Sequence, residues 1–440
     1  MLEDMYQFQQ IQKQLIQQLQ LFSIDHGQYP THNLEVNIAS LPFLPLLKGQ
    51  NKAIQQSPDL LPRIYWQNKQ QTKTLACFGA IEQCHSTPKA TEESFYIGGL
   101  AFQQQGEQWQ DFPATLFVRP MIVFQQLNQP STTQCQVIFH FNGRHSIQQT
   151  IKNISALRLP QTLIPFKAKS LSRKDSPCKM EWAKLVDLAI EYKALLPKVV
   201  LSRQTELCFD SPIDSWDLIA LWQKAEPNSF HYVFQFSQYN TFISCSPERL
   251  FDRHNQQVST EALAGTVNRG RNEREDALLI QSLLNDKKID RENHIVQEFI
   301  IANLKQLKAE VSCYPAEVLQ LKNVQHLRVP IKALLHKETQ DSELLYKLHP
   351  TPAVGGIPKL PALQFINDNE PYVRGWYAGA IGCISEHESD FSVAIRSALI
   401  TDNCIKLFAG AGIVTGSIAE QEWQELENKI QTILTILGTQ

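Results

Sequence analysis

The strand-like segments in the second half of this chain occur in two groups, and a helical stretch closes each group. The first group precedes a helical stretch from about 272 to 307, and the second precedes a last helix from about 419 to 437. The groups comprise KVVLSRQTEL, HYVFQFS, NTFISCS and ALAGTV, and then GWYAGAIGCIS, FSVAIRSALI and IKLFAGAGIV. Strands grouped in this way, without strict alternation of strand and helix, predict an α+β fold with large antiparallel or mixed sheets.

The first 180 residues predict a β-rich part without obvious chemistry. They are rich in Gln and Pro and contain strand-like runs at 63–66, 114–118 and 135–141. The Ser/Lys-rich stretch around 167–178 is the best candidate for a linker. We therefore distinguish an N-terminal part, residues 1–180, from a C-terminal part, residues 181–440, which could form two domains or one unusually large body.

The composition of the chain excludes several classes of partner. The net charge is only −3 and the lysines and arginines are scattered, so no surface for nucleic acid or an anionic membrane is indicated. The Gln-rich N-terminus lacks the basic region of a secretory signal, and no stretch approaches the roughly 20 apolar residues of a membrane helix. The nine cysteines are widely spaced without a CxxC pair, which favours reduced packing residues. We expect a soluble, cytoplasmic protein with a small-molecule partner.

Two predicted helices carry carboxylates that need a chemical explanation. Helical spacing puts Glu292 on an apolar face, where a carboxylate must be paired, protonated or bound to a metal. Glu422, Glu425 and Lys429 follow at i, i+3 and i+7 beside the apolar stripe of the last helix. A set of glutamates without His or Cys suits Mg²⁺. A salt bridge for Glu292 and a solvated face for the last helix are the alternatives.

A lysine and a glutamate at strand ends are candidates for acid-base chemistry. Lys198 opens a strand directly after Pro197, and partial burial can lower the pKa of a lysine enough for it to act as a general base. Glu248 follows Pro247, where a carboxyl can project into a cleft and act as a general acid if desolvation raises its pKa. The alternatives are a lysine that reaches water and a glutamate that pairs with Arg249.

Glycine segments, one arginine and two histidines complete the candidates. The segments at 262–266 and 408–414 could present backbone N–H groups to an anion, but neither has the spacing of a nucleotide-binding loop. Arg396 alternates opposite apolar residues and could bind a carboxylate, or it could belong to a structural ion pair. His326 and His349 could be ligands, although single histidines are more often packed and hydrogen-bonded.

Nine short motifs in a fixed order carry a resemblance to a known family. They are KVVLSR at 198–203, SPERLF at 246–251, TEALAGT at 260–266, DRENHIV at 290–296, VQHLR at 324–328, LHPTPAVGG at 348–356, GWYAGAIG at 375–382, FAGAGIVTGS and EWQELENK. Over about residues 181–438 the chain resembles the chorismate-utilising enzymes, which include anthranilate, aminodeoxychorismate, salicylate and isochorismate synthases. PRIYWQ at 62–67 and YIGGLAF at 96–102 look like the menaquinone-pathway isochorismate synthases in particular.

The resemblance implies a fold and a set of binding residues. The fold would be one large body in which two big β-sheets pack in the core with helices outside, and the N-terminal part would complete it. Glu292 and Glu425 would hold Mg²⁺, with Glu422 completing the site, and the metal would bind the ring carboxylate of chorismate. The implied substrate-binding residues are Gly265, Thr266, Ala353, Tyr377, Arg396, Gly410, Gly412 and Lys429.

The resemblance also implies a reaction. Lys198 would activate a water that attacks ring C2, while Glu248 protonates the departing C4 hydroxyl, which gives isochorismate. Ammonia-using members usually carry Gln at the position of Lys198, and aminodeoxychorismate synthases carry a nucleophilic lysine where this chain has Ala264. An isochorismate synthase without a glutamine amidotransferase subunit is therefore expected. A salicylate synthase, a siderophore-pathway isochorismate synthase and a non-catalytic chorismate-binding protein are the alternatives.

Overall fold

The computed structural model describes residues 2–320 and 324–439, and only the backbone of 2–5, 56, 264–266, 268, 287–292, 324 and 326. Within this part of the chain twenty strands pair, always antiparallel, into one hydrogen-bonded network, which we describe as two sheets that share the long strand β5 (Thr115–Asn128). The first residues of β5 pair with β4 and its last residues with β6, so one strand passes from one sheet into the other. The predicted mixture of helices with large antiparallel sheets is confirmed.

The first sheet runs from β1 near the N-terminus to β7, which lies beside the strand that begins with Lys198. Its order is β1 (Leu34–Ile38), β6 (Thr133–Phe139), β5, β3 (Lys73–Cys84), β2 (Arg63–Gln67), β9 (Phe230–Gln235), β10 (Asn240–Ser246), β19 (Ser397–Thr401), β20 (Cys404–Val414), β8 (Lys198–Phe209) and β7 (Ser170–Ser176). The short β16 (Gly356–Ile357) also pairs with β8. The predicted linker around 167–178 is wrong, because β7 forms there as a neighbour of β8.

The second sheet combines strands from both parts of the chain in the same way. Its order is β5, β4 (Phe95–Leu100), β17 (Ala380–Ser385), β18 (Glu388–Val393), β11 (Arg249–His254), β12 (Gln257–Asn268) and β15 (Val324–Leu334), and both β13 (Glu310–Cys313) and β14 (Glu317–Gln320) pair with β15. Strands of residues 1–180 thus pair with strands of residues 181–440 three times, β2 with β9, β4 with β17 and β7 with β8.

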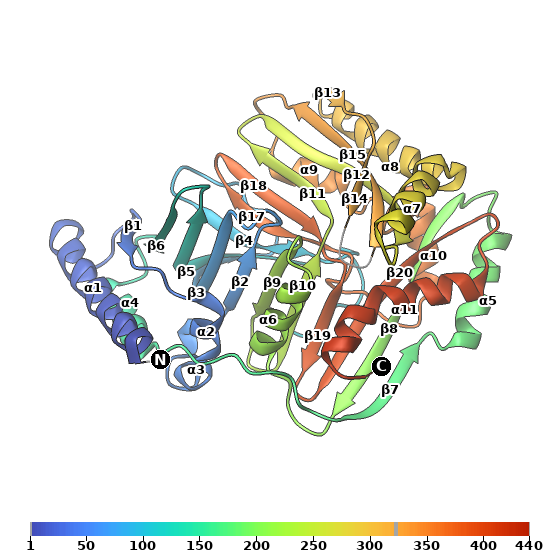
Figure 1. Cartoon of the computed structure of the whole chain (residues 1–440). Coiled ribbons are helices and arrows are strands. Elements are labelled where there is room, and N and C mark those ends of the chain that lie inside the picture. The colour runs from blue at the N-terminus through green and yellow to red at the C-terminus, as the bar shows by residue number, and fades with distance from the viewer. Residues whose placement is uncertain (1, 321–323, 440) are drawn as a thin grey trace.

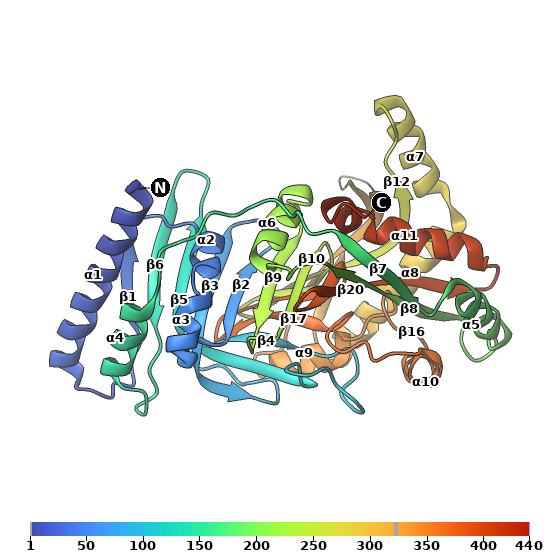
Figure 2. The same cartoon turned by 90° about the horizontal axis from the view of Figure 1, so that it is seen from below.

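The helices lie around these sheets. They are α1 (Leu2–His26), α2 (Phe43–Lys48), α3 (Asn51–Gln56), α4 (Ile147–Ala156), α5 (Lys179–Glu191), α6 (Ser215–Ala225), α7 (Glu273–Asn285), α8 (Lys287–Gln306), α9 (Asp341–Leu348), α10 (Lys359–Asn369) and α11 (Ala419–Ile436), with a short 3-10 turn at Pro58–Leu60. Figure 1 shows α1 and α4 at one end of the molecule and α5, α7, α8 and α11 at the opposite end, and Figure 2 shows the same separation from below. No described helix is long and apolar enough to span a membrane.

Two predicted elements are each divided in the structure. The helical stretch from 272 to 307 breaks at Asp286, which leaves the helical conformation and caps α7. The predicted strand FSVAIRSALI forms two strands, because the chain bends at 394–396 as it leaves β18 for β19. Arg396 lies in this bend with a φ of 48°, so the predicted alternation of Arg396 with strand residues is wrong. The bend is required because β18 and β19 belong to different sheets.

An aromatic cluster fills the space between the sheets. Trp376 is fully buried just before β17, and its ring contacts Phe234 of β9 and Phe242 of β10. Phe112 from the N-terminal part stacks edge-on against the same tryptophan, 5.3 Å between ring centres. The Trp376 indole N–H donates to the Pro113 carbonyl oxygen, 2.9 Å away. Both parts of the chain therefore contribute to one core.

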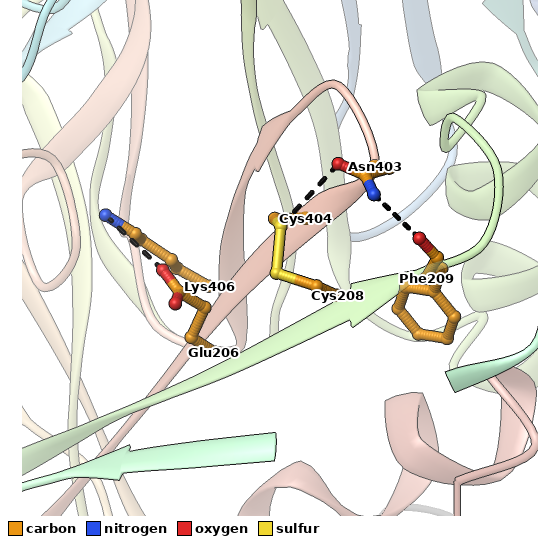
Figure 3. Close-up of a disulfide and its surroundings, with 6 residues drawn as sticks. All are labelled: Glu206, Cys208, Phe209, Asn403, Cys404 and Lys406. Atoms are coloured by element: carbon orange, nitrogen blue, oxygen red, sulfur yellow. Dashed lines mark hydrogen bonds and ion pairs between the residues drawn. A yellow bond between two sulfur atoms is a disulfide. The ribbon is translucent and has the colours of Figure 1, made fainter. Parts of the chain in front are cut away.

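One pair of cysteines is bonded, so the prediction that all nine are reduced is wrong. Cys208 of β8 and Cys404 of β20 are register partners with Cα atoms 4.1 Å apart, and a disulfide joins them (Figure 3). Beside them the Asn403 side-chain amide donates to the Phe209 carbonyl oxygen, 2.7 Å away. Spacing along the sequence gives no sign of this pair, because its members are 196 residues apart and only strand register brings them together.

Candidate active site

The strand pair β8 and β20 supports one wall of the candidate site. Lys198 is the first residue of β8, is only 4% exposed and pairs in register with Val414. Gly410 and Gly412 lie on the same ladder, opposite Ser202 and Val200. The lysine and the glycine segment, which are more than 200 residues apart in the sequence, are thus neighbours on adjacent strands.

Gly410 is required by a close approach of Tyr377. A Cβ atom at Gly410 would lie 2.8 Å from the Tyr377 hydroxyl and 3.2 Å from a methyl of Val200. Tyr377 is 3% exposed and stacks on Phe408, with 5.1 Å between ring centres. Burial raises the pKa of Tyr377 well above its usual value, so its hydroxyl keeps its proton and can donate a hydrogen bond.

Arg396 lies in the bend between β18 and β19 and acts electrostatically on this tyrosine. Its backbone carbonyl accepts a hydrogen bond from the Cys245 N–H at 3.0 Å, which holds the bend against β10. Burial lowers the pKa of the Arg396 guanidinium, and the negative charges of Glu226 and Glu425 act in the opposite direction. No ion pair to Arg396 is found among the side chains that the structure describes. The structural ion pair considered from the sequence is therefore not observed there.

Helix α11 brings its two acids and its lysine to the glycine segment. The Lys429 ammonium donates to the Gly410 carbonyl oxygen at 2.7 Å and to the Glu425 carboxylate at 2.5 Å. Glu422 is only 6% exposed, whereas the side chain of Glu425 is 40% exposed. The solvated face that was the alternative for this helix does not hold for Glu422, and Lys429 links the helix directly to β20.

Glu248 lies in the turn between β10 and β11 and is held by its backbone. Its N–H donates to the Ser246 hydroxyl at 3.3 Å, and its carbonyl accepts from the Val393 N–H at 3.0 Å. The side chain is buried, with the residue 7% exposed. The pKa of Glu248 is raised to about 7, first by burial and then by the carboxylate of Glu261, against the charges of Lys69, Lys198 and Lys429, which lower it. Glu248 therefore carries its proton in a large fraction of molecules at neutral pH.

Several predicted site residues can be followed only in the backbone. Ala264, Gly265 and Thr266 lie in β12 at a register shift opposite β15, and Glu292 lies in α8. Their side chains lie outside the described residues, as does that of His326. Asn293, the next residue of α8, donates to the Ala262 carbonyl at 3.1 Å and to the Leu327 carbonyl at 2.9 Å, and so fixes the helix to β12 and β15.

A buried ion pair that the sequence did not suggest fixes the loop containing Ala353. The Arg374 guanidinium donates to both Glu370 carboxylate oxygens, to the Val354 carbonyl at 3.0 Å and to the Val200 carbonyl at 2.7 Å. The loop after His349 is thereby joined to β8 two residues after Lys198. His349 is buried, and burial lowers its pKa to about 3, so it is a neutral packed residue as the commoner alternative predicted.

A second ion pair missed by the sequence analysis comes from the N-terminal part. The hairpin between β2 and β3 carries Lys69, whose ammonium lies 3.0 Å from the Glu261 carboxylate of β12. Both side chains are about nine-tenths buried, with exposures of 10% and 8%. The other Glu261 oxygen lies 3.3 Å from the Arg328 guanidinium of β15. A single lysine in a polar hairpin sequence gave no signal for this contact.

The arrangement combines a buried lysine, a buried carboxyl with a raised pKa and hydrogen-bond donors for an anion. Lys198 and Glu248 are both buried and influence each other electrostatically, as an acid-base pair requires. No cluster of three or more potential metal ligands is found among the described side chains, which do not include Glu292. The carboxylates of Glu422 and Glu425, one turn apart on α11, are hard oxygen ligands that fit Mg²⁺.

Comparison with known proteins identifies relatives along nearly the whole chain. The family described as "Chorismate binding enzyme" matches residues 85–438. "Isochorismate synthase MenF" of Escherichia coli (strain K12) is 34% identical over 393 residues, which cover 87% of this chain and 89% of the relative. The corresponding protein of Haemophilus influenzae is 31% identical, with 92% and 91% covered.

A solved structure shows the same fold. The structure of MenF, described as the menaquinone-specific isochorismate synthase from Escherichia coli, superposes with a TM-score of 0.84 at 30% identity, and covers 96% of this chain and 99% of that chain. The anthranilate synthase component I of Streptococcus pneumoniae has a TM-score of 0.69 at 20% identity, which is a likeness of fold alone. The expected fold of two large sheets with outer helices is thereby confirmed.

Proposed function

The chain belongs to the chorismate-binding enzyme family, and we propose that it is an isochorismate synthase that interconverts chorismate and isochorismate for menaquinone biosynthesis. The observation that carries the proposal is the presence of two buried groups of opposite kind that act on each other electrostatically, Glu248 and Lys198, of which Lys198 lies on the strand paired with the Gly410 segment. The names of the relatives support both the reaction and the pathway.

In the proposed reaction Lys198 and Glu248 divide the proton transfers. Lys198 takes a proton from the water that attacks ring C2, and Glu248 gives its proton to the C4 hydroxyl as it leaves. The protonated state of Glu248 near neutral pH supports its role as the acid, because an efficient acid has a pKa close to the working pH. The reverse reaction exchanges the two roles.

Substrate binding is assigned to groups at both ends of the site. The enolpyruvyl carboxylate would be held by Arg396, Tyr377 and the backbone of Gly410 and Gly412. Two observations support this assignment: Arg396 lies in a bend outside the regular strands, and it interacts electrostatically with Tyr377. The ring end would be held by Lys429 and by the remaining predicted residues Gly265, Thr266 and Ala353.

We also propose that the enzyme uses Mg²⁺. Glu292, Glu425 and Glu422 would hold the ion, and the low exposure of Glu422 supports a role other than contact with water. When bound, the ion would supply positive charge for the ring carboxylate of the substrate. Glu425→Gln should raise the Mg²⁺ concentration needed for half-maximal activity, measured by titrating the metal-stripped enzyme.

The direct test is incubation with chorismate and Mg²⁺ followed by chromatography. Isochorismate without salicylate is expected. Salicylate together with pyruvate would indicate a salicylate synthase, and the absence of turnover would indicate a chorismate-binding protein without catalysis.

Lys198→Ala tests the mechanism. Loss of the base should lower kcat by about 10²–10⁴-fold. Lys406→Ala is the matched control, because Lys406 lies on the neighbouring strand β20 with 39% of its side chain exposed and should leave kcat unchanged. Full activity of Lys198→Ala would contradict the proposed role.

A further inference from the structure

Two adjacent residues of the hairpin between β2 and β3 contact the two strands that follow the proposed acid, β11 and β12. Lys69 binds Glu261 of β12 at 3.0 Å, and the side-chain oxygen of Gln70 accepts a hydrogen bond from the Arg249 guanidinium at 2.7 Å. Arg249 directly follows Glu248, and its backbone N–H also points to the Glu261 carboxylate, 3.4 Å away. The tip of this hairpin therefore contacts the residue that follows Glu248 and a carboxylate of β12 next to it.

The hairpin tip is well fixed. The Asn68 side-chain oxygen accepts from the Lys73 N–H at 3.1 Å, and the Asn68 amide donates to the Thr72 hydroxyl at 2.8 Å. Gln71 adopts a left-handed φ of 57°, which closes the turn. These bonds order the turn that carries Lys69, and its ammonium contacts Glu261 of β12 from that turn.

We propose that Lys69 and Glu261 are positioning residues for the acid, and that their ion pair adjusts how tightly Glu248 holds its proton, with Glu261 strengthening and Lys69 weakening the hold. This inference rests on the proposed role of Glu248. It assigns a catalytic contribution to the N-terminal part of the chain, whose sequence shows no active-site motif.

The physical basis is the balance of charge around a buried carboxyl. Glu261 alone, as a like charge, would keep Glu248 protonated so strongly that it would be a poor proton donor. Lys69 offsets part of that charge, and Arg328 offsets more from the other side. Among the described side chains, Lys198 of β8, Lys429 of α11 and Tyr377 before β17 also interact electrostatically with Glu248. A donor that is half protonated near the working pH is the most effective.

A purely structural ion pair predicts a different outcome from this charge balance. Removal of either partner of a structural pair would harm the protein in the same direction. Under the proposal, Lys69→Met should move the alkaline limb of the pH–kcat profile upward and Glu261→Gln should move it downward, each by roughly 1 pH unit. The double variant Lys69→Met/Glu261→Gln should return close to the original midpoint.

The experiment measures these midpoints in two ways. The pH dependence of kcat for chorismate gives the first. The second is an infrared titration of the protonated-carboxyl band that Glu248→Gln abolishes, which reports on Glu248 without turnover. Lys69→Arg keeps the charge and should keep the original midpoint, and Lys73→Met, in the same hairpin but paired with Glu388, is the matched control.

The outcomes separate this inference from the proposed function. Opposite infrared shifts for Lys69→Met and Glu261→Gln support the charge balance even if no isochorismate forms. Shifts in the same direction, or unchanged midpoints in variants that unfold thermally like the parent, overturn it even if isochorismate is made. If Lys69→Met does not fold, a downward shift in Glu261→Gln with an unchanged midpoint in Lys69→Arg still supports the inference, and any other pattern contradicts it.

Discussion

The two parts of the chain differ sharply in what their sequences reveal, although they build the same sheets. Residues 181–440 contain all nine family motifs and every predicted site residue. Residues 1–180 contain strand patterns and turns, and yet their strands β2 and β4 pair with β9 and β17 of the other part. One of their hairpins brings Lys69 to the neighbourhood of Glu248.

This difference shows that family motifs in a sequence locate the active-site residues but do not locate the boundary of a folding unit. Residues that take part in the reaction must be of one residue type, so they form recognisable motifs. The residues that support them need only the right shape and polarity, and many sequences satisfy that need. We propose that residues 1–180 and 181–440 unfold as one unit, and variants in both parts can test this and sharpen the comparison.

The largest expected effect concerns the disulfide within the C-terminal part. Cys208→Ser/Cys404→Ser should lower the free energy of unfolding by about 5 kcal/mol, because the cross-link closes a loop between residues 196 positions apart. Denaturant unfolding under oxidising conditions measures this, with the unbonded Cys84→Ser as control. One transition that shifts as a whole supports a single unit, whereas two transitions of which only one moves would refute it.

The ion pair between Lys48 and Asp217 joins the two parts directly. The Lys48 ammonium of α2 lies 2.7 Å from the Asp217 carboxylate of α6, and both side chains are less than 10% exposed. Lys48→Met leaves a buried carboxylate unpaired and should cost about 3–5 kcal/mol. Lys48→Met/Asp217→Asn should recover much of that loss in the same unfolding measurement. A Lys48→Met protein as stable as the parent would show that this contact does not couple the parts.

The proposed acid should itself destabilise the protein at alkaline pH. The pKa of Glu248 rises from 4.5 to about 7 on folding, so the folded state binds the proton more tightly than the unfolded state. This contribution to stability is complete below about pH 4.5 and is lost as the pH rises through 7. Glu248→Gln should therefore be more stable than the parent at pH 8, by at most about 3 kcal/mol.

Unfolding at about pH 5 and pH 8 measures this difference, and kcat is measured on the same protein. Equal stability gains for Glu248→Gln at both pH values would contradict the raised pKa. If Glu248→Gln is more stable than the parent only at the higher pH and also loses most of its kcat, then the Glu248 carboxyl lowers the stability of the protein but is needed for the reaction.

The smallest effect is expected where β4 joins the two parts. A Cβ at Gly98 would lie 2.0 Å from the Leu116 carbonyl oxygen and 2.7 Å from the Phe117 Cα atom. Gly98→Ala should therefore cost about 1–3 kcal/mol through overpacking. Thermal unfolding measures the loss, and the exposed Ser86→Ala is the control. An unchanged melting temperature for Gly98→Ala would mean that β4 is displaced at little cost.

Much of the fold followed from local patterns. The helix at α11 and the strands β8, β9, β10 and β20 agree with their sequence predictions because side-chain periodicity is a local property. The bend at Arg396 and the strand β7 did not, because both depend on which sheet the chain joins next. The roles of Lys198 and Glu248 remain proposals, although burial and the pKa of Glu248 support them.

The sequence by itself determined the family and the type of fold, because ordered motifs and side-chain periodicity record both. The candidate acid, base and metal ligands came from the resemblance to that family, since spacing alone left other roles open for each of them. The tertiary structure alone decided that Cys208 bonds Cys404, that Arg374 joins the Ala353 loop to β8 and that Lys69 reaches Glu261 across 192 residues. Such contacts depend on strand register and on the packing of distant segments. No local pattern records that information.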